Sequence, residues 1–335
     1  VRSRSTFKEI IMRLVEIENT LLFEQDKFFS QCHASTILKV GEKLLCAFFA
    51  GTEEGKDDVR IFLMTNENGK WSDPEQMSFT KDIPCWNPVL LENDGTIYLF
   101  FKVGKKITKW QTYLRTSTDG GKTWSEASEL VEGDKSGGRG PVKNKAIVLS
   151  DGTVVAPASV ETNTKWDAFI DFSKDNCKTW QKSNLIEFDH KKAVGKGIIQ
   201  PTLWEADGKV YALLRSTEGY VLRSFSEDLV NWSPAEKADL PNNNSGIDCV
   251  KLPDGSVAVF HNPIACADWG DRNIISYAIT KDNGETFLPA VEVEKDEDKD
   301  AEYSYPAAIT DGEYVYLTYT HYRKNVMFRK FRIED

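Results

Sequence analysis

Side chains that can bind hydroxyl groups recur at one register of this 335-residue chain. Six glycines lie between pairs of apolar segments, and five of them follow an aspartate, a dipeptide typical of tight β-hairpins. The first strand of each hairpin begins about eight positions before its glycine, and there we find polar residues rather than Val or Ile. In the first four hairpins this register holds His33, Asn87, Asn144 and Gln200. In the fifth it holds Ile247, or Asp248 if that hairpin is one residue shorter. In the sixth it holds Ser304, which has Tyr303 and Tyr305 beside it.

The second strand of each hairpin carries a matching set, seven positions after the glycine. Because the two strands of a hairpin are antiparallel, both sets lie at the same end of every unit. The second set is Phe48, Lys102, Ser159, Arg215, Asn262 and Tyr319. Further candidate binding residues near these positions are Trp86, Lys143, Lys145, Asn244 and His321.

These residue types suit a sugar that carries a negative charge. Amide and carboxylate groups bind hydroxyls, aromatic rings stack on sugar faces, and Lys102, Arg215 and Lys143 or Lys145 could hold a carboxylate. A local cluster of cations is informative in a chain of net charge −10, because its sign opposes that of the whole protein. We expect a small anionic ligand, such as a sialic or uronic acid at a glycan end. The simpler alternative is that strand ends are polar because they meet water.

An internal repeat supplies the elements that must position these residues. A box of the pattern Ser/Thr-x-Asp-x-x-x-Thr-Trp/Phe begins at residues 117, 173 and 280, and looser copies begin at 65 and 226. Its aspartate can accept backbone N–H bonds across a turn, so we expect the box to be structural. The turn glycines repeat out of phase with it, at Gly41, Gly95, Gly152, Gly208, Gly255 and Gly312.

Each unit of about 53 residues thus holds a hairpin, a third strand and a boxed turn, with room for a fourth strand. Six such units predict an all-β protein, a six-bladed β-propeller. They account for the whole of residues 12–335, so a single propeller domain is expected there. The strand predicted at 326–333 lacks a partner beyond it, and we expect residues 13–23 to complete that blade and close the ring. Residues 1–11 are expected to be a non-native or disordered leader.

Composition excludes several functional classes. The chain is 40% hydrophobic and 28% charged, as in ordinary globular proteins. An acidic chain without a run of Lys and Arg is a poor nucleic-acid binder. The longest apolar run, residues 44–50, is far below the roughly 20 residues that span a bilayer. No signal peptide is recognisable, so we expect a cytoplasmic protein, with secretion left open, and the composition does not predict an oligomeric state.

The cysteines and histidines predict no metal site and no cofactor. The six cysteines have no C-x-x-C spacing, and the four histidines have no metal-ligand spacing. The cysteines lie in apolar, strand-like segments, which favours buried free thiols in a reducing compartment. Cys32 precedes His33, but neighbouring strand residues face opposite ways, so both cannot face one site.

The boxes at 117 and 173 resemble the motif of the sialidase (neuraminidase) superfamily, in particular its BNR/Asp-box sialidase-like proteins. The resemblance covers residues 27–335 and includes the stretches 32–37, 85–90, 143–145 and 303–306. It implies the six-bladed propeller that the repeat count predicts independently. It also implies three arginines on a substrate carboxylate, an Asp acid/base and a Tyr nucleophile.

Residue by residue, the resemblance places the nucleophile at Tyr303 and the acid/base near Asp57 or Asp58. The first arginine of the family would fall at Gln31, where this chain has none, whereas Arg215 could stand for one of the three. Strand alternation puts Tyr303 and Tyr305 on one face, so the residues alone do not choose between them.

Three functions remain open on this evidence. The first is an exo-acting glycoside hydrolase for a terminal anionic sugar, with Tyr303 or Tyr305 as nucleophile and Asp57, Asp58 or His33 as proton donor. The second is a uronate lyase, in which Lys102 and Arg215 neutralise the carboxylate while His33 and a tyrosine act as base and acid. The third is a non-catalytic glycan-binding propeller, since a fold does not imply activity.

Overall fold

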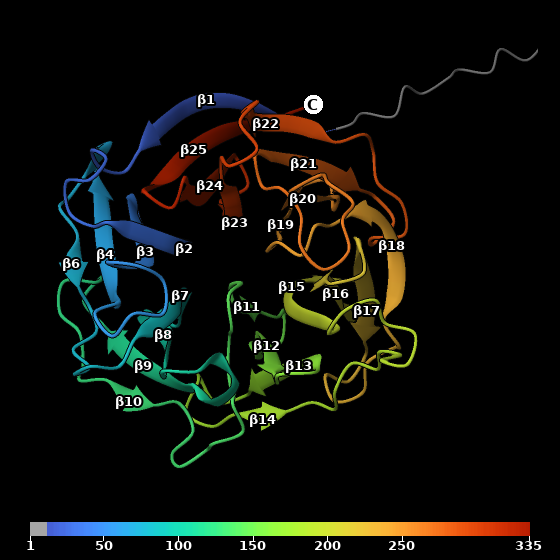
Figure 1. Cartoon of the computed structure of the whole chain (residues 1–335), viewed down its shortest axis with the longest axis horizontal. Helices are drawn as coiled ribbons and strands as arrows, with labels where there is room; N and C mark the ends of the chain where they lie inside the picture. The colour runs from blue at the N-terminus through green and yellow to red at the C-terminus, as the bar shows by residue number, and fades with distance from the viewer. Residues whose placement is uncertain (1–11) are drawn as a thin grey trace, which may run out of the picture.

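Six antiparallel β-sheets surround one central axis in the computed structural model, which describes residues 12–335. Figure 1 shows them as a ring in which β2, β7, β11, β15, β19 and β23 lie nearest the centre. Every strand of residues 12–335 belongs to one of these sheets, and we number the sheets as blades 1 to 6. The fold is the predicted six-bladed β-propeller, and the expectation for residues 1–11 lies outside the described residues.

The first three blades follow one another along the chain. Blade 1 contains β2 (Gln31–Val40), β3 (Lys43–Gly51), β4 (Arg60–Glu67), β5 (Lys70–Trp71) and β6 (Glu75–Gln76). Blade 2 contains β7 (Cys85–Asn93), β8 (Thr96–Val103), β9 (Gln111–Ser117) and β10 (Ser128–Glu129), with the short 3₁₀ helix η1 (Ile107–Lys109) before β9. Blade 3 contains β11 (Ile147–Val148), β12 (Val154–Glu161), β13 (Trp166–Ser173) and β14 (Gln181–Lys182).

The last three blades complete the ring. Blade 4 contains β15 (Ile198–Ala206), β16 (Lys209–Ser216), β17 (Tyr220–Ser226) and β18 (Glu236–Pro241). Blade 5 contains β19 (Asp248–Lys251), β20 (Val257–His261), β21 (Ile274–Thr280) and β22 (Val291–Lys295). Blade 6 contains β23 (Tyr303–Thr310), β24 (Tyr314–His321), β25 (Asn325–Glu334) and β1 (Arg13–Leu21).

The strand nearest the N-terminus closes the ring, as predicted. β1 runs antiparallel to β25, from the pair Arg13 and Glu334 to the pair Leu21 and Met327. A strand from one end of the chain thereby covers the outer edge of the last blade, and an unpaired edge is avoided. Within residues 12–335, no helix is long and apolar enough to cross a membrane.

The aspartate boxes form the turns between third and fourth strands. In the box after β9, the Asp119 carboxylate accepts hydrogen bonds from the Thr123 hydroxyl at 2.6 Å, the Thr123 amide at 2.9 Å and the Lys122 amide at 3.0 Å. These bonds, the Thr123 hydroxyl first, lower the pKa of Asp119 below its ordinary value. Asp175 and Asp282 make equivalent bonds, so the box is structural, as predicted.

β-Bulges interrupt the innermost strands of four blades near the start of each strand. The register shifts in β2, β7, β15 and β23, and each shift includes a non-glycine residue with positive φ. These residues are Ala34, Asn87, Gln200 and Tyr305, with φ between 40° and 55°. Such a conformation is costly for residues other than glycine and is found preferentially at functional sites. A bulge also breaks the alternation of faces, so the expectation that Tyr303 and Tyr305 share a face is wrong.

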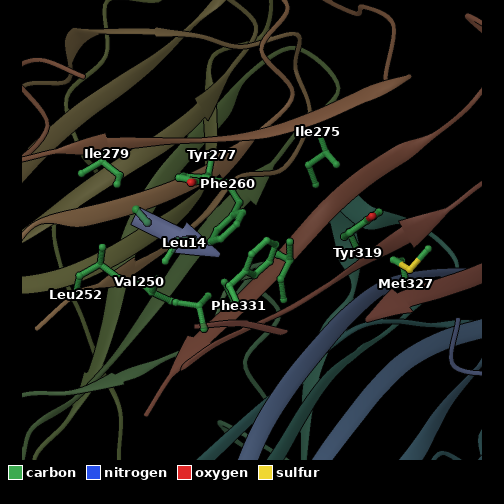
Figure 2. Close-up of a cluster of buried hydrophobic side chains, with 14 of the residues drawn as sticks. Leu14, Val250, Leu252, Phe260, Ile275, Tyr277, Ile279, Tyr319, Met327 and Phe331 are labelled. Carbon is green, nitrogen blue, oxygen red and sulfur yellow. The ribbon is translucent and has the colours of Figure 1, made fainter. Parts of the chain in front are cut away.

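Hydrophobic side chains fill the spaces between neighbouring blades. Figure 2 shows the cluster between blades 5 and 6, where Phe260 of β20 and Phe331 of β25 lie close together. Their ring centroids are 6.4 Å apart. Leu14 of β1 packs into the same cluster, so ring closure also buries apolar surface.

Ile275→Val tests this inter-blade packing. Ile275 is fully buried in the cluster, so loss of one methylene is expected to lower the free energy of unfolding by about 0.5–1.5 kcal/mol. The same change at the exposed Ile17 of β1 should cost less than about 0.5 kcal/mol. Urea unfolding followed by tryptophan fluorescence measures both, and equal effects would contradict the packing described.

The cysteines match the prediction of free thiols. All six are unpaired and five are buried, while Cys266 is partly exposed. Burial raises the pKa of Cys32 to about 12. Because Cys32 packs in the core of blade 1, it is not placed to act as a nucleophile beside His33.

Candidate functional site

A cavity of about 210 Å³ lies where all six blades meet at one end of the propeller axis. Most of its lining side chains come from the bulged starts of inner strands and the ends of second strands, and the others from the loops between them. Charged and polar lining residues are His33, Glu54, Asn87, Glu161, Gln200, Arg215, Arg272, Tyr305 and Arg323. Trp86, Trp110, Trp166, Trp269, Ile107 and Ile199 form its apolar walls.

Three arginines from three blades line this cavity. Arg215 ends β16, Arg272 lies in the loop before β21, and Arg323 lies in the turn between β24 and β25. Arg272 is only 5% exposed, and its Nε has no hydrogen-bond partner among the described residues. An unsatisfied buried donor beside two further cations creates a local demand for a bound anion.

Glu302 forms ion pairs with two of these arginines. Its carboxylate is 3.0 Å from Nη1 of Arg272 and 2.7 Å from Nε of Arg323, and Ser304 donates to it at 2.6 Å. Burial opposes ionisation of Glu302, but Arg323 and Arg272 lower its pKa below its ordinary value. Glu302 is therefore ionised at neutral pH and fixes the orientation of both guanidinium groups.

Tyr305 points its hydroxyl at a cation. Nη1 of Arg215 donates to the Tyr305 oxygen at 2.7 Å, and the amide of Gln200 donates at 3.5 Å. Arg215 is itself held by the side-chain oxygens of Asn244 at 2.8 Å and Gln200 at 3.0 Å. The Tyr305 hydroxyl thus lies inside the cavity in direct contact with a cation.

His33 lies against Tyr305 as a neutral ring. The two ring centroids are 4.2 Å apart, and Nδ1 of His33 is 2.7 Å from the hydroxyl of Thr320. Burial, together with the charges of Arg323 and Arg272, lowers the pKa of His33 well below 6.5. A neutral imidazole can accept a proton but is a poor donor at physiological pH.

Two glutamates that line the cavity are in opposite environments. Glu54, in the loop after β3, forms a close ion pair with Arg323. Glu161, the last residue of β12, is 9% exposed and has no hydrogen bond or ion pair among the described residues. Burial raises the pKa of Glu161 above its ordinary value of 4.5. One of these two carboxyls is thus ion-paired, whereas the other has no partner among residues 12–335.

Tryptophan side chains make the cavity suitable for a sugar. Trp269 is 58% exposed at the rim, and its ring lies 3.9 Å from the guanidinium carbon of Arg272. Trp86 and Trp110 form an edge-to-face pair on another wall, with their ring centroids 6.1 Å apart. Flat aromatic faces beside hydrogen-bonding groups suit the apolar faces and hydroxyls of a pyranose.

Six of the residues singled out from the sequence line this cavity: His33, Trp86, Asn87, Gln200, Arg215 and Tyr305. Three more support it from outside. Asn244 holds Arg215, Asn144 donates to the carbonyls at the Gln200 bulge at 3.0 and 2.8 Å, and the Lys143 ammonium lies 5.6 Å from the Tyr305 ring centroid. Lys143 also donates to the carbonyl oxygens of Ile247 and Pro306, so it ties blades 3, 5 and 6 together.

Four other predicted ligand residues instead connect strands and blades. Lys102 is fully buried and donates to Thr112 and to the Arg139 carbonyl, both at 2.6 Å, and burial lowers its pKa to about 7. Lys145 and Asp248 form an ion pair at 2.9 Å. Asn262 donates to two carbonyl oxygens, at 2.6 and 2.7 Å. The placement of these four side chains in the cavity, expected from register, is wrong because each turns toward a neighbouring strand.

Tyr303, Tyr319 and His321 also lie outside the cavity. Their partners are acidic: Tyr319 and His321 contact Glu294, and the Tyr303 hydroxyl is 3.5 Å from Asp296. Burial and these negative charges raise the pKa of Tyr303 above its ordinary value. Of the two tyrosines, only Tyr305 lines the cavity.

Asp57 and Asp58 do not reach the cavity either. Asp57 is exposed and pairs with Lys105 at 2.9 Å. Burial opposes ionisation of Asp58, but its carboxylate accepts hydrogen bonds from the hydroxyl and amide of Thr52, and together with other contacts these lower its pKa. Both carboxylates are engaged with other partners, and Glu54 is the member of the β3–β4 loop that lines the site.

Sequence reasoning missed Arg272, Arg323, Glu54 and Glu161, together with three of the four tryptophans. Most of these residues lie in loops, outside the strand register on which the prediction depended. A usable signal was present in the bulges, because Asn87, Gln200 and Tyr305 are each followed directly by proline. Proline removes an N–H from the ladder, and inside a strand it marks a bulge or an edge.

Comparisons with known proteins agree with this architecture. The model of the BNR repeat-like domain family matches residues 42–317. A protein of Bacteroides fragilis (strain YCH46) named "Sialidase" is 25% identical over 241 residues, which are 67% of this chain and 42% of that protein. The chain therefore spans less than half the length of this relative.

Three solved structures share the fold. The Hadza microbial sialidase Hz136 superposes with a TM-score of 0.78 at 16% identity, over 94% of this chain and 68% of that one. A protein of unknown function from Dyadobacter fermentans superposes with a TM-score of 0.76 at 18% identity, over 96% of this chain and 99% of that one. The Trypanosoma rangeli sialidase superposes with a TM-score of 0.69 at 14% identity, over 96% of this chain and 60% of that one. At these identities the likeness shows the fold alone.

Proposed function

Because this chain belongs to the BNR repeat-like domain family and to the sialidase-like superfamily of propellers, we propose that it is an exo-acting glycoside hydrolase for a terminal anionic sugar. The observation that carries the proposal is the convergence of Arg215, Arg272 and Arg323 on the cavity that contains Tyr305. Cations around a nucleophile favour a substrate whose carboxylate lies next to its reacting carbon.

The size of the cavity supports an exo-acting enzyme. Its volume of about 210 Å³ is below the range of about 300–1,000 Å³ for sites that take drug-sized ligands. One sugar ring fits such a space, whereas the rest of a glycan would extend past the exposed Trp269. The arginines would bind the carboxylate of that ring through charge-assisted hydrogen bonds.

Tyr305 supplies the nucleophile in this proposal. An anionic anomeric centre repels a carboxylate nucleophile, whereas a phenol that receives a hydrogen bond from Arg215 can attack it. Attack would form a glycosyl–tyrosine bond that water then hydrolyses. Gln200, a neutral amide, lies beside the phenol and orients it without adding charge.

A panel of umbelliferyl glycosides tests the proposal. N-acetylneuraminic acid, 2-keto-3-deoxynononic acid and glucuronic acid provide anionic substrates, and glucose provides the neutral control. We expect fluorophore release from at least one acidic glycoside and none from the glucoside. Equal cleavage of the neutral glycoside would contradict the proposal, and binding without turnover of any acidic glycoside would favour a glycan-binding propeller.

A uronate lyase is the second candidate, and one feature favours it. Among the described residues, no carboxylate hydrogen-bonds to Tyr305, and a neutral His33 lies against its ring. In a lyase His33 would remove the proton next to the carboxylate and Tyr305 would protonate the leaving oxygen. The product carries a new double bond, so ultraviolet absorbance of an oligosaccharide digest separates lyase from hydrolase.

A further inference from the structure

Glu161 lines the cavity, and its carboxyl group has no partner among the residues that the structure describes. It ends β12 opposite Trp166 of β13, which also lines the cavity, so the hairpin holds both side chains at the site. The residue is 9% exposed, and no hydrogen bond or ion pair to its carboxyl is found within residues 12–335. A buried polar group normally has a partner, so this one is available to a ligand or to catalysis.

Three cations face Glu161 from different strands or loops. They are Arg215 of β16, Lys196 just before β15 and Lys102 of β8, and each of them favours the ionised carboxylate. Burial outweighs their combined effect and raises the pKa of Glu161. The group therefore holds its proton to a higher pH than an exposed glutamate does.

The other acidic groups near the site are already engaged. Glu54 pairs with Arg323, Asp57 pairs with Lys105 of the loop after β8, and Asp58 accepts a hydrogen bond from Thr52. His33 is neutral because burial lowers its pKa. An unpaired carboxyl with a raised pKa beside a carboxyl that is already ion-paired is the better placed of the two to donate a proton.

We propose that Glu161 is the acid/base of the glycosidase reaction, a role that rests on the proposed function. Glu161 gives its proton to the glycosidic oxygen as the bond from that oxygen to the anomeric carbon breaks. In the same step the Tyr305 oxygen forms the glycosyl–tyrosine bond, and the phenol proton passes to solvent, from which Tyr305 regains it when water displaces it. The Glu161 carboxylate then takes a proton from water, whose oxygen displaces Tyr305. The sugar is released, and both side chains return to their starting states.

Glu161→Gln tests this assignment through its dependence on the leaving group. The variant keeps the shape of the side chain but removes the transferable proton. For a natural disaccharide, whose alcohol leaving group needs protonation, kcat/KM is expected to fall by about 10²–10⁴-fold. In the umbelliferyl glycoside of the same sugar, the umbelliferone group leaves readily as an anion. For this substrate the decrease in kcat/KM should stay below about tenfold.

Two matched variants serve as controls for Glu161→Gln. Asp57→Asn, outside the cavity and paired with Lys105, should leave kcat/KM unchanged for both substrates. Glu54→Gln breaks the ion pair with Arg323 and should change kcat/KM by the same factor for both substrates. If Glu54→Gln alone showed dependence on the leaving group, the acid would be Glu54 and the assignment to Glu161 would fall.

The pH profile provides an independent check. Because the protonated form of Glu161 is the active one, kcat/KM of the wild type should decline as pH rises through its raised pKa, and Glu161→Gln should lose that alkaline limb. A raised pKa in the folded state also means that stability is lost as pH rises above 4.5. Glu161→Gln should therefore be more stable than the wild type at neutral pH. If Glu161 only supported the fold, the same substitution would lower the stability of the protein.

The outcomes separate the two proposals. A wild-type protein that cleaves none of the acidic glycosides overturns the proposed function and this inference with it. A wild type that cleaves both substrates, with an equal loss for both in Glu161→Gln, overturns the assignment of Glu161 alone.

Discussion

Tyr305→Phe is expected to lower kcat on an acidic glycoside by at least about 10³-fold, since loss of a catalytic nucleophile costs up to about 10⁶-fold. The change removes one oxygen and keeps the ring that packs against His33 at 4.2 Å. Substrate binding should change little, because Arg272 and Arg323 stay in place on Glu302. Steady-state kinetics together with calorimetric titration of the free sugar acid measures both effects.

Tyr303→Phe is the matched control for this experiment. It removes the same group from a tyrosine two residues away, whose hydroxyl contacts Asp296 and Tyr322 instead of the cavity. Its turnover should stay within about threefold of the wild type. A large loss in Tyr303→Phe with full turnover in Tyr305→Phe would mean that the bulge in β23 does not select the nucleophile as described.

Arg215→Ala is expected to weaken binding of an acidic sugar by roughly ten- to a hundredfold, because a charge-assisted contact contributes about 1.5–3 kcal/mol. Binding of the methyl ester of the same sugar should weaken much less, since the ester carries no charge. Arg215 also donates to the Tyr305 oxygen at 2.7 Å, so kcat should fall as well. Titration calorimetry with the acid and its ester gives the ratio directly.

Arg223→Ala controls for the loss of an arginine from the same blade. Arg223 lies on β17 and pairs with Glu285 and Glu236, away from the cavity. It should leave the affinity for both ligands unchanged. If Arg215→Ala weakened acid and ester by the same factor, the arginine would be acting through shape and not through charge.

The architecture could be predicted from the sequence because its determinants are local. Asp119 and Thr123 close a turn within five residues, and an Asp-Gly pair closes five of the six hairpins within two, so these signals are visible in the chain itself. Repetition at about 53 residues then gives the number of blades. The pairing of β1 with β25 was predictable for a related reason, since a blade with three strands leaves an open edge.

The composition of the site was only partly predictable, because strand register assumes a regular alternation of faces. Bulges in β2, β7, β15 and β23 break that alternation where the polar residues lie. Tyr305, with φ of 55°, therefore turns into the cavity, whereas Tyr303 packs among acidic groups. Lys102 and Asp248 have the predicted register, but they find partners on neighbouring strands.

The sequence by itself determined the six blades, the closure of the ring and the end of the propeller where polar groups gather, since each follows from contacts within a unit or from counting units. Only the tertiary structure decided that Arg272 and Arg323 join Arg215, and that Glu54 is paired while Glu161 is not. These residues lie far apart in the chain, on loops and strand ends with no common spacing. They meet because ring closure brings the ends of all six blades to one axis, where burial and neighbouring charges set the state of each group.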